Sequence, residues 1–168
     1  YYFLSGFTSK VAGTEVGVTE PQTTFSACFG AAFLPLHPTK YAELLGGKLQ
    51  SNPLIKVWLL NTGFSGGPYG VGKRMSLPHT RALITSALTG KLNEVNYEVH
   101  PIFSLHFPTV CEGVPAEVLN PRNTWSSPET YDIKAAELAK AIHNNFKKFE
   151  DKASDEVKAA APKVLAEA

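Results

Sequence analysis

The sequence predicts an α/β fold, and three observations carry that prediction. Residues 55–60 form a continuous apolar run that ends in Asn-Thr-Gly, which is typical of a strand buried on both faces of a sheet. A Gly-rich loop follows, and residues 76–90 then have the cap, early proline and final glycine of a helix. Residues 127–149 have a second helical pattern. Strand, Gly-rich loop, helix, strands and helix is the order of an α/β protein.

Two further elements precede the apolar run. Residues 1–30 are rich in Gly and Thr and broken by Pro21, which predicts a short helical or extended lead-in and then a long loop. Pro38 and the apolar spacing that follows it predict a helix over residues 38–50. The paired glycines 46 and 47 weaken that helix.

Residues 97–109 alternate in part between apolar and polar and are interrupted by Pro101, which predicts strand material. In the last strong helix Ser127 is the cap and Pro128 the first residue. Its predicted buried side consists of Ile133, Leu138, Ala141, Ile142 and Phe146. We treat residues 1–168 as one segment, with 151–168 as a weakly helical, peripheral tail.

Composition narrows the class of protein. The chain has 168 residues, of which 43% are hydrophobic and 18% charged, enough for a domain with a core. Its net charge of +1 gives no electrostatic reason to expect a nucleic-acid or membrane partner. No apolar run reaches the ~18 to 20 residues that span a bilayer.

The two cysteines, Cys28 and Cys111, lie far apart and form no C-x-x-C motif. A reduced compartment, the cytoplasm, is the simpler interpretation, and one extracellular disulfide is the alternative. The chain opens on Tyr1 inside an apolar segment, without an initiator Met or a basic leader. We therefore expect it to be part of a longer polypeptide.

The Gly-rich loop in residues 61–77 has the G-x-x-x-x-G-K spacing of a phosphate-binding P-loop, ending at Lys73. Arg74 stands where Ser or Thr would hold magnesium, and Pro68 removes one N–H from the cradle. The predicted helix begins near Ser76, so Lys73 lies before it rather than in its first turn. Residues 1–131 also contain no Asp to position a metal.

This chemistry alone favours a simple Gly-rich connection with two solvated basic residues. The loop has one feature that suits a nucleotide, because the Arg74 guanidinium can stack on a base or bind oxygens in a fork. Thr80 can add a hydroxyl group from the first helical turn.

Several blocks of the sequence resemble a known family. They are "FLSGFTSKVAGTE", "GVTEPQTTFSACFGAAFLPLHPTKYAELL", "NTGFSGGPYGVGKR", "TRALI" and "LNPRNTW", in this order from residue 1 to about residue 150. Together they closely resemble the C-terminal part of ATP-dependent phosphoenolpyruvate carboxykinase. The resemblance implies the C-terminal part of that family's mixed-sheet nucleotide-binding domain.

The implied reaction is the gluconeogenic conversion of oxaloacetate and ATP to phosphoenolpyruvate, CO₂ and ADP. The implied cofactors are ATP, Mg²⁺ and Mn²⁺. By position, the residues that contact the nucleoside side of ATP are Arg74, Met75 and Thr80. The family's phosphate loop, catalytic lysine and metal ligands lie upstream of this segment. The resemblance therefore implies that this segment alone is inactive and has no catalytic or metal-binding residue.

Two alternatives to this function remain: a non-catalytic nucleotide-binding or interaction module on the same scaffold, and an independent P-loop ATPase.

Other candidate residues are expected to have structural rather than functional roles. The histidines lack metal-site spacing, and a surface or capping role is favoured for His79. Cys28 and the nearby phenylalanines are expected in the core. Arg122 and Asn123 are expected to fix a turn.

Overall fold

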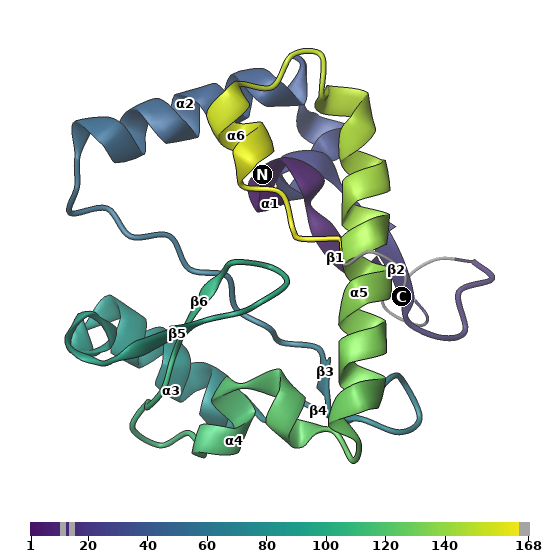
Figure 1. The fold of residues 1–168 in the computed structure, drawn as a ribbon, viewed down its shortest axis with the longest axis vertical. Helices are drawn as coiled ribbons and strands as arrows, with labels where there is room; N and C mark the ends of the chain where they lie inside the picture. Colours follow the sequence, from purple (N-terminus) through teal and green to yellow (C-terminus); the bar gives the residue numbers. More distant parts are fainter. Residues whose placement is uncertain (11–12, 14–15, 165–168) are drawn as a thin grey trace. The chain divides into compact units, whose positions relative to one another are not determined.

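The computed structural model describes residues 1–10, 13 and 16–164. Glu15 and the end of the predicted tail, residues 165–168, lie outside the described residues. The chain forms two compact units, Tyr1–Val57 with Leu138–Val164, and Trp58–Glu137. Helices alternate with two-stranded antiparallel sheets, which confirms the predicted mixture of α and β structure (Figure 1).

The first unit begins with a short helix and a hairpin. Its elements are α1 (Tyr2–Ser5), β1 (Phe7–Lys10), β2 (Gln22–Phe25), the 3₁₀ turns η1 (Ala27–Phe29) and η2 (Ala31–Phe33), α2 (Pro38–Ser51), the C-terminal part of α5 (Pro128–Phe146), η5 (Lys147–Phe149) and α6 (Asp155–Ala159). Pro38 is the first residue of α2, as predicted, and the helix continues through both glycines. The tail forms the short helix α6, as its weak pattern predicts.

The core of the first unit joins both ends of the chain. Leu4, Ala27, Phe146 and Phe149 are buried together. The Tyr1 ring stacks on Phe146 with 4.0 Å between centroids. Burial of these large apolar groups stabilises the unit by roughly 1.5 to 3 kcal/mol for each fully buried side chain.

Cys28 packs against this cluster from η1, with a positive φ of 53°. The expectation that the nearby phenylalanines lie in the core is wrong for two of them, because Phe29 is 51% exposed and Phe33 is 87% exposed. They lie in 3₁₀ turns of only three residues each, which are too short to form an apolar face.

The second unit contains two hairpins and a helix between them. Its elements are β3 (Phe64–Ser65), β4 (Lys73–Arg74), α3 (Leu77–Leu88), η3 (Lys91–Glu94), β5 (Tyr97–Val99), β6 (His106–Pro108), α4 (Ala116–Leu119), η4 (Pro121–Thr124) and the N-terminal part of α5. Leu92, Cys111 and Val114 form its buried cluster, against which α3 packs Ala82, Leu83 and Ala87.

The predicted helix starts are confirmed. The Ser76 hydroxyl accepts the backbone N–H of His79 at 3.3 Å and caps α3. The Ser127 hydroxyl accepts the N–H of Thr130 at 3.2 Å and caps α5. Gly90 follows α3 with φ 78°, a conformation that glycine adopts without the strain of a side chain.

The predicted buried side of α5 is partly wrong. Its buried residues are Tyr131, Ala135, Ala139, Ile142 and Phe146, whereas Ile133 is 59% exposed. Ile133 lies two positions after Tyr131, which is about 200° around the helix. The buried stripe of α5 therefore begins at Tyr131, which was not among the predicted buried residues.

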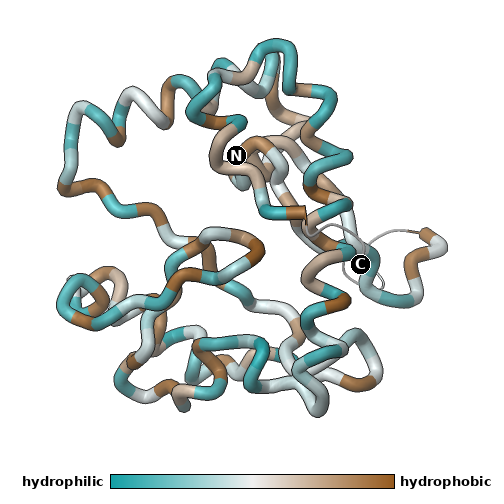
Figure 2. The backbone as a smooth tube through the Cα atoms, viewed as in Figure 1, coloured by the Kyte–Doolittle hydropathy of each residue, from teal (hydrophilic) through white to brown (hydrophobic). Residues whose placement is uncertain are grey.

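The clearest predicted strand, residues 55–63, is also absent. Within the part of the chain that the structure describes, residues 55–60 form neither helix nor strand and belong to no sheet. The six apolar side chains of residues 54–60 are between 38% and 85% exposed. Figure 2 shows this hydrophobic stretch as brown segments after α2. A strand needs a hydrogen-bonded neighbour, and local sequence cannot supply one.

Candidate functional site

The Gly-rich stretch is a hairpin loop. β3 and β4 are antiparallel, with Phe64 opposite Arg74 and Ser65 opposite Lys73. Residues 66–72 connect them, and Ser76 then caps α3. A P-loop passes directly from a strand into a helix whose first turn contains the lysine. Here Lys73 is in a strand, so the geometry is not that of a P-loop.

Close backbone packing fixes the shape of this loop. The Pro68 carbonyl accepts the N–H groups of Val71 and Gly72 at 3.0 and 2.8 Å. A Cβ atom at Gly72 would lie 2.3 Å from the Gly67 carbonyl oxygen, closer than any real contact. Gly67 itself has φ 153°, in the region that favours glycine. Gly67 and Gly72 are thus required by the packing of the loop on itself.

A long-range contact anchors the hairpin to the turn before α5. The Thr124 hydroxyl donates to the Pro121 carbonyl at 2.7 Å, so the Ser65 hydroxyl, 2.9 Å away, donates to Thr124. A Cβ atom at Gly66 would lie 2.8 Å from the Thr124 carbonyl oxygen. The backbone of the loop therefore approaches this turn as closely as glycine allows.

The three predicted nucleotide-contacting residues lie on the connection from β4 to α3. Arg74 ends β4 and is exposed, and among the described residues its guanidinium has no hydrogen-bond or ion-pair partner. The N–H of Met75 donates to Gly63 at 2.7 Å, so that group is already occupied. Thr80 is half-buried in the first turn of α3. Of the three, Arg74 and the Thr80 hydroxyl offer polar groups to a ligand.

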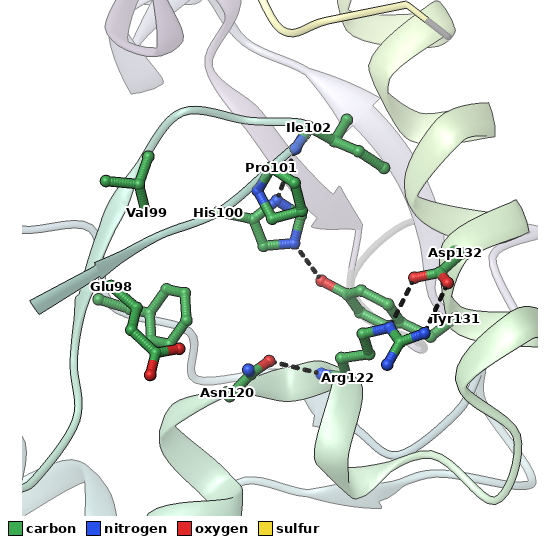
Figure 3. Close-up of a pocket in the computed structure, with 10 residues that line it drawn as sticks. Glu98, Val99, His100, Pro101, Ile102, Asn120, Arg122, Tyr131 and Asp132 are labelled. Atoms are coloured by element: carbon green, nitrogen blue, oxygen red, sulfur yellow. Dashed lines mark hydrogen bonds and ion pairs between the residues drawn. The ribbon is translucent and has the colours of Figure 1, made fainter.

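A cavity of about 100 Å³ lies elsewhere in the same unit (Figure 3). It is lined by Glu98, Val99, His100, Pro101, Ile102, Phe107, Asn120, Arg122, Tyr131 and Asp132. Sequence reasoning did not select His100, because it lies outside any recognised motif. The one local signal in the sequence is that His100 directly precedes Pro101, the residue that interrupts the predicted strand material.

The side chain of His100 is held by three hydrogen bonds. Its Nδ1 accepts the backbone N–H groups of Ile102 and Phe103, each at 3.2 Å, and its Nε2 lies 2.7 Å from the Tyr131 hydroxyl. Burial lowers the pKa of His100, although nearby Asp132 acts in the opposite direction. Burial also raises the pKa of Tyr131 to about 12, with a smaller contribution from Asp132. Both groups are therefore neutral near pH 7.

Arg122 lines the other side of the cavity and forms a bidentate ion pair with Asp132. Its Nε and Nη2 donate to the two carboxylate oxygens, each at 2.9 Å. The hydrogen bond from Arg122 is the main reason that the pKa of Asp132 lies below its ordinary value. Asn120 caps the turn by accepting the Arg122 N–H, so the expected turn is present but Asn120 is its side-chain cap. Hydrogen bonds within the chain thus occupy both ring nitrogens of His100 and both carboxylate oxygens of Asp132.

Other features of the described residues limit the chemistry. Cys28 and Cys111 are free thiols rather than a disulfide pair. Residues 1–10, 13 and 16–164 contain no group of three or more His, Cys, Asp or Glu side chains placed to hold a metal. The same residues form no helix that is both long and apolar enough to cross a membrane.

Comparison with known proteins identifies the family. The family model described as phosphoenolpyruvate carboxykinase matches residues 1–117. The chain belongs to the phosphoenolpyruvate carboxykinase family. It is 59% identical over 162 residues to the phosphoenolpyruvate carboxykinase (ATP) of Christiangramia forsetii, covering 96% of this chain and 30% of that protein. Identity to the Flavobacterium johnsoniae carboxykinase is 57% over 162 residues, with the same coverage of 96% and 30%.

A more distant relative gives the same assignment. The phosphoenolpyruvate carboxykinase (ATP) of Thermus thermophilus is 53% identical over 163 residues, which is 97% of this chain and 31% of that protein. The chain therefore spans about 30% of the length of the curated carboxykinases that it matches. This family assignment confirms the resemblance drawn from the sequence blocks.

Proposed function

We propose that this chain is the C-terminal part of the nucleotide-binding domain of an ATP-dependent carboxykinase. The enzyme would convert oxaloacetate and ATP to phosphoenolpyruvate, CO₂ and ADP in gluconeogenesis, in the cytoplasm. The observation that carries the proposal is the 59% identity over 96% of the chain to a carboxykinase of which it covers 30%. ATP, Mg²⁺ and Mn²⁺ would be its cofactors, with the metal ligands outside this segment.

Within that enzyme the segment would supply the nucleoside-side wall of the ATP site. Arg74 supports this role because its exposed guanidinium is unpaired among the described residues and can bind a base by stacking or by hydrogen bonds. Met75 would contribute packing, since its N–H already donates to Gly63. Thr80 would contribute its hydroxyl group. The anchored hairpin would hold these groups in place before the nucleotide binds, which reduces the entropy cost of binding.

The exposed apolar run at residues 54–60 supports the proposal that the rest of the domain is another part of the polypeptide. Six apolar side chains there have no sheet around them, although the run has the composition of a strand buried on both faces. We propose that it pairs with strands supplied by the remaining part of the enzyme. Residues 151–168 would remain a peripheral tail.

Two experiments test the proposal. The purified 168-residue chain, assayed for ATP- and Mn²⁺-dependent decarboxylation of oxaloacetate, is expected to give no turnover above a protein-free control. In the full-length enzyme, Arg74→Ala is expected to raise the KM for ATP more than Lys73→Ala does. Turnover by the isolated chain would contradict its assignment as an inactive part. A larger effect at Lys73 would instead favour a P-loop ATPase.

A non-catalytic nucleotide-binding or interaction module remains the second candidate, since the chain covers only 30% of its relatives. The distinguishing observation is whether the encoding gene also specifies an upstream phosphate loop with its lysine, histidine and aspartate residues. Without that upstream part, the carboxykinase proposal fails.

A further inference from the structure

The hairpin places an aromatic pair beside Arg74. Directly opposed residues of antiparallel strands share one face, so Phe64 and Arg74 point to the same side of the hairpin. The Tyr69 ring packs edge-to-face on Phe64, with 5.6 Å between centroids and 90° between planes. The loop thus positions Tyr69 next to the face that carries the guanidinium.

Tyr69 is both accessible and held in place. It is 52% exposed, so much of its ring surface is open. The loop that carries it is shaped by two N–H bonds to Pro68 and by the contact that excludes a side chain at Gly72. The link from Ser65 to Thr124 fixes the base of the same hairpin. An exposed ring on so constrained a loop loses little conformational freedom when a ligand binds.

We propose that Tyr69 is a further contact for the nucleotide, stacking on the purine base beside Arg74. This proposal rests on the nucleoside-side role proposed above for the segment. A purine has two flat faces and a polar edge, and aromatic rings with an adjacent guanidinium are the side chains that bind such faces. Tyr69 therefore recognises a purine ring as a class, while the polar groups of Arg74 and Thr80 bind its edge or ribose.

The test uses the full-length carboxykinase that carries this segment and measures dissociation constants by calorimetry. Tyr69→Ala is expected to weaken ATP binding about 5- to 100-fold, because stacking of one base on an aromatic ring contributes that much. Tyr69→Phe keeps the ring and is expected to stay within about twofold of the original protein. Inorganic tripolyphosphate, which has no base, is expected to bind all of these variants equally.

Three controls make the outcomes distinct. Val71→Ala truncates another exposed side chain of the same loop and is expected to leave ATP binding unchanged. Tyr69→Leu keeps apolar volume without an aromatic face, and replaces the alanine variant if that does not fold. Arg74→Ala tests the underlying nucleoside-side role, since it is expected to weaken ATP binding whether or not Tyr69 takes part.

Unchanged ATP affinity in Tyr69→Ala or Tyr69→Leu overturns the inference, and so does an equal loss for ATP and tripolyphosphate. A lowered melting temperature of the ATP-free Tyr69→Ala or Tyr69→Leu variant, together with unchanged ATP affinity, would show that the ring packs on the rest of the enzyme instead of on a base. If only the Arg74 variant weakens ATP binding, the Tyr69 inference alone fails. If neither residue affects it, the proposed nucleoside-side role fails as well.

Discussion

His100 and Tyr131 form a buried hydrogen bond of 2.7 Å that ties the turn between β5 and β6 to the N-terminal part of α5. The donor and acceptor of this hydrogen bond follow from the bonds made by the other nitrogen of the His100 ring. Because Nδ1 accepts two backbone N–H groups, it carries no proton, and the neutral ring must carry its proton on Nε2. Nε2 therefore donates and the Tyr131 oxygen accepts.

Tyr131→Phe is expected to destabilise the chain by about 1 to 3 kcal/mol, because it leaves the buried Nε2–H of His100 without an acceptor. Chemical denaturation at pH 7.5 measures the change. Tyr69→Phe is the matched control, since it removes the same atom from an exposed ring and is expected to change stability by less than about 0.5 kcal/mol. Equal effects of the two substitutions would contradict the assigned bond.

Stability is expected to fall as the pH falls below about 6.5, the ordinary pKa of histidine. The pKa of His100 is lowered in the folded chain, so the unfolded chain binds the proton first. The full contribution is therefore present above about pH 6.5 and is lost as the pH falls toward the folded pKa. Denaturation midpoints from pH 7.5 to 5 measure this dependence.

His100→Asn is the comparison for the pH experiment, because asparagine does not titrate. It is expected to be less stable at pH 7.5 but to lose less stability on acidification. The other charged groups that face His100, which are Glu98, Arg122 and Asp132, stay in both proteins. Identical pH profiles would exclude His100 as the source.

Gly72→Ala is expected to destabilise the hairpin by about 1 to 3 kcal/mol, since the new Cβ atom would lie 2.3 Å from the Gly67 carbonyl oxygen. Gly46→Ala is the control, because a Cβ atom at Gly46 in α2 meets nothing within 4 Å. That helical change is expected to stabilise the chain by about 0.5 to 1 kcal/mol. Denaturation curves of both variants measure these changes in stability, which are expected to have opposite signs.

The double variant Val57→Lys, Leu59→Lys is expected to reduce self-association of the isolated chain. Exposed apolar side chains in a segment outside any helix or sheet offer a surface for association with other chains. Sedimentation velocity and binding of a hydrophobic dye measure the change. Ile133→Lys replaces an exposed apolar residue outside that segment and is expected to have little effect.

Local patterns predicted α2, α3 and α5 correctly because the determinants of these helices are local. Ser76 and Ser127 cap the helices that follow them, and Pro38 and Pro128 occupy first positions where the missing N–H costs nothing. The β5–β6 hairpin was also predicted as strand material. These features need only residues within a few positions of one another.

The predictions that were wrong or missing concern residues whose interaction partners are distant in the sequence. The apolar run at residues 54–60 has the composition of a strand, but pairing depends on another segment of chain. Ile133 was assigned to the core by its residue type, whereas the buried stripe of α5 begins at Tyr131. The hydrogen bonds of His100 could not be predicted, because no spacing rule joins residues that are 31 positions apart. The assignment of Arg74, Met75 and Thr80 to a nucleotide remains a prediction.

The hydrogen bond between Ser65 and Thr124 also determines an order of events during folding. It joins positions 59 residues apart, so it can form only after the chain between them has been synthesised and has folded enough to bring the two residues together. During synthesis from the N-terminus, the Gly-rich hairpin emerges well before its anchor. The hairpin can close early on its own short-range bonds, but it reaches its final position only after Thr124 has been added. Loss of the Thr124 hydroxyl would therefore leave the Gly-rich hairpin, which is synthesised earlier, without this anchor.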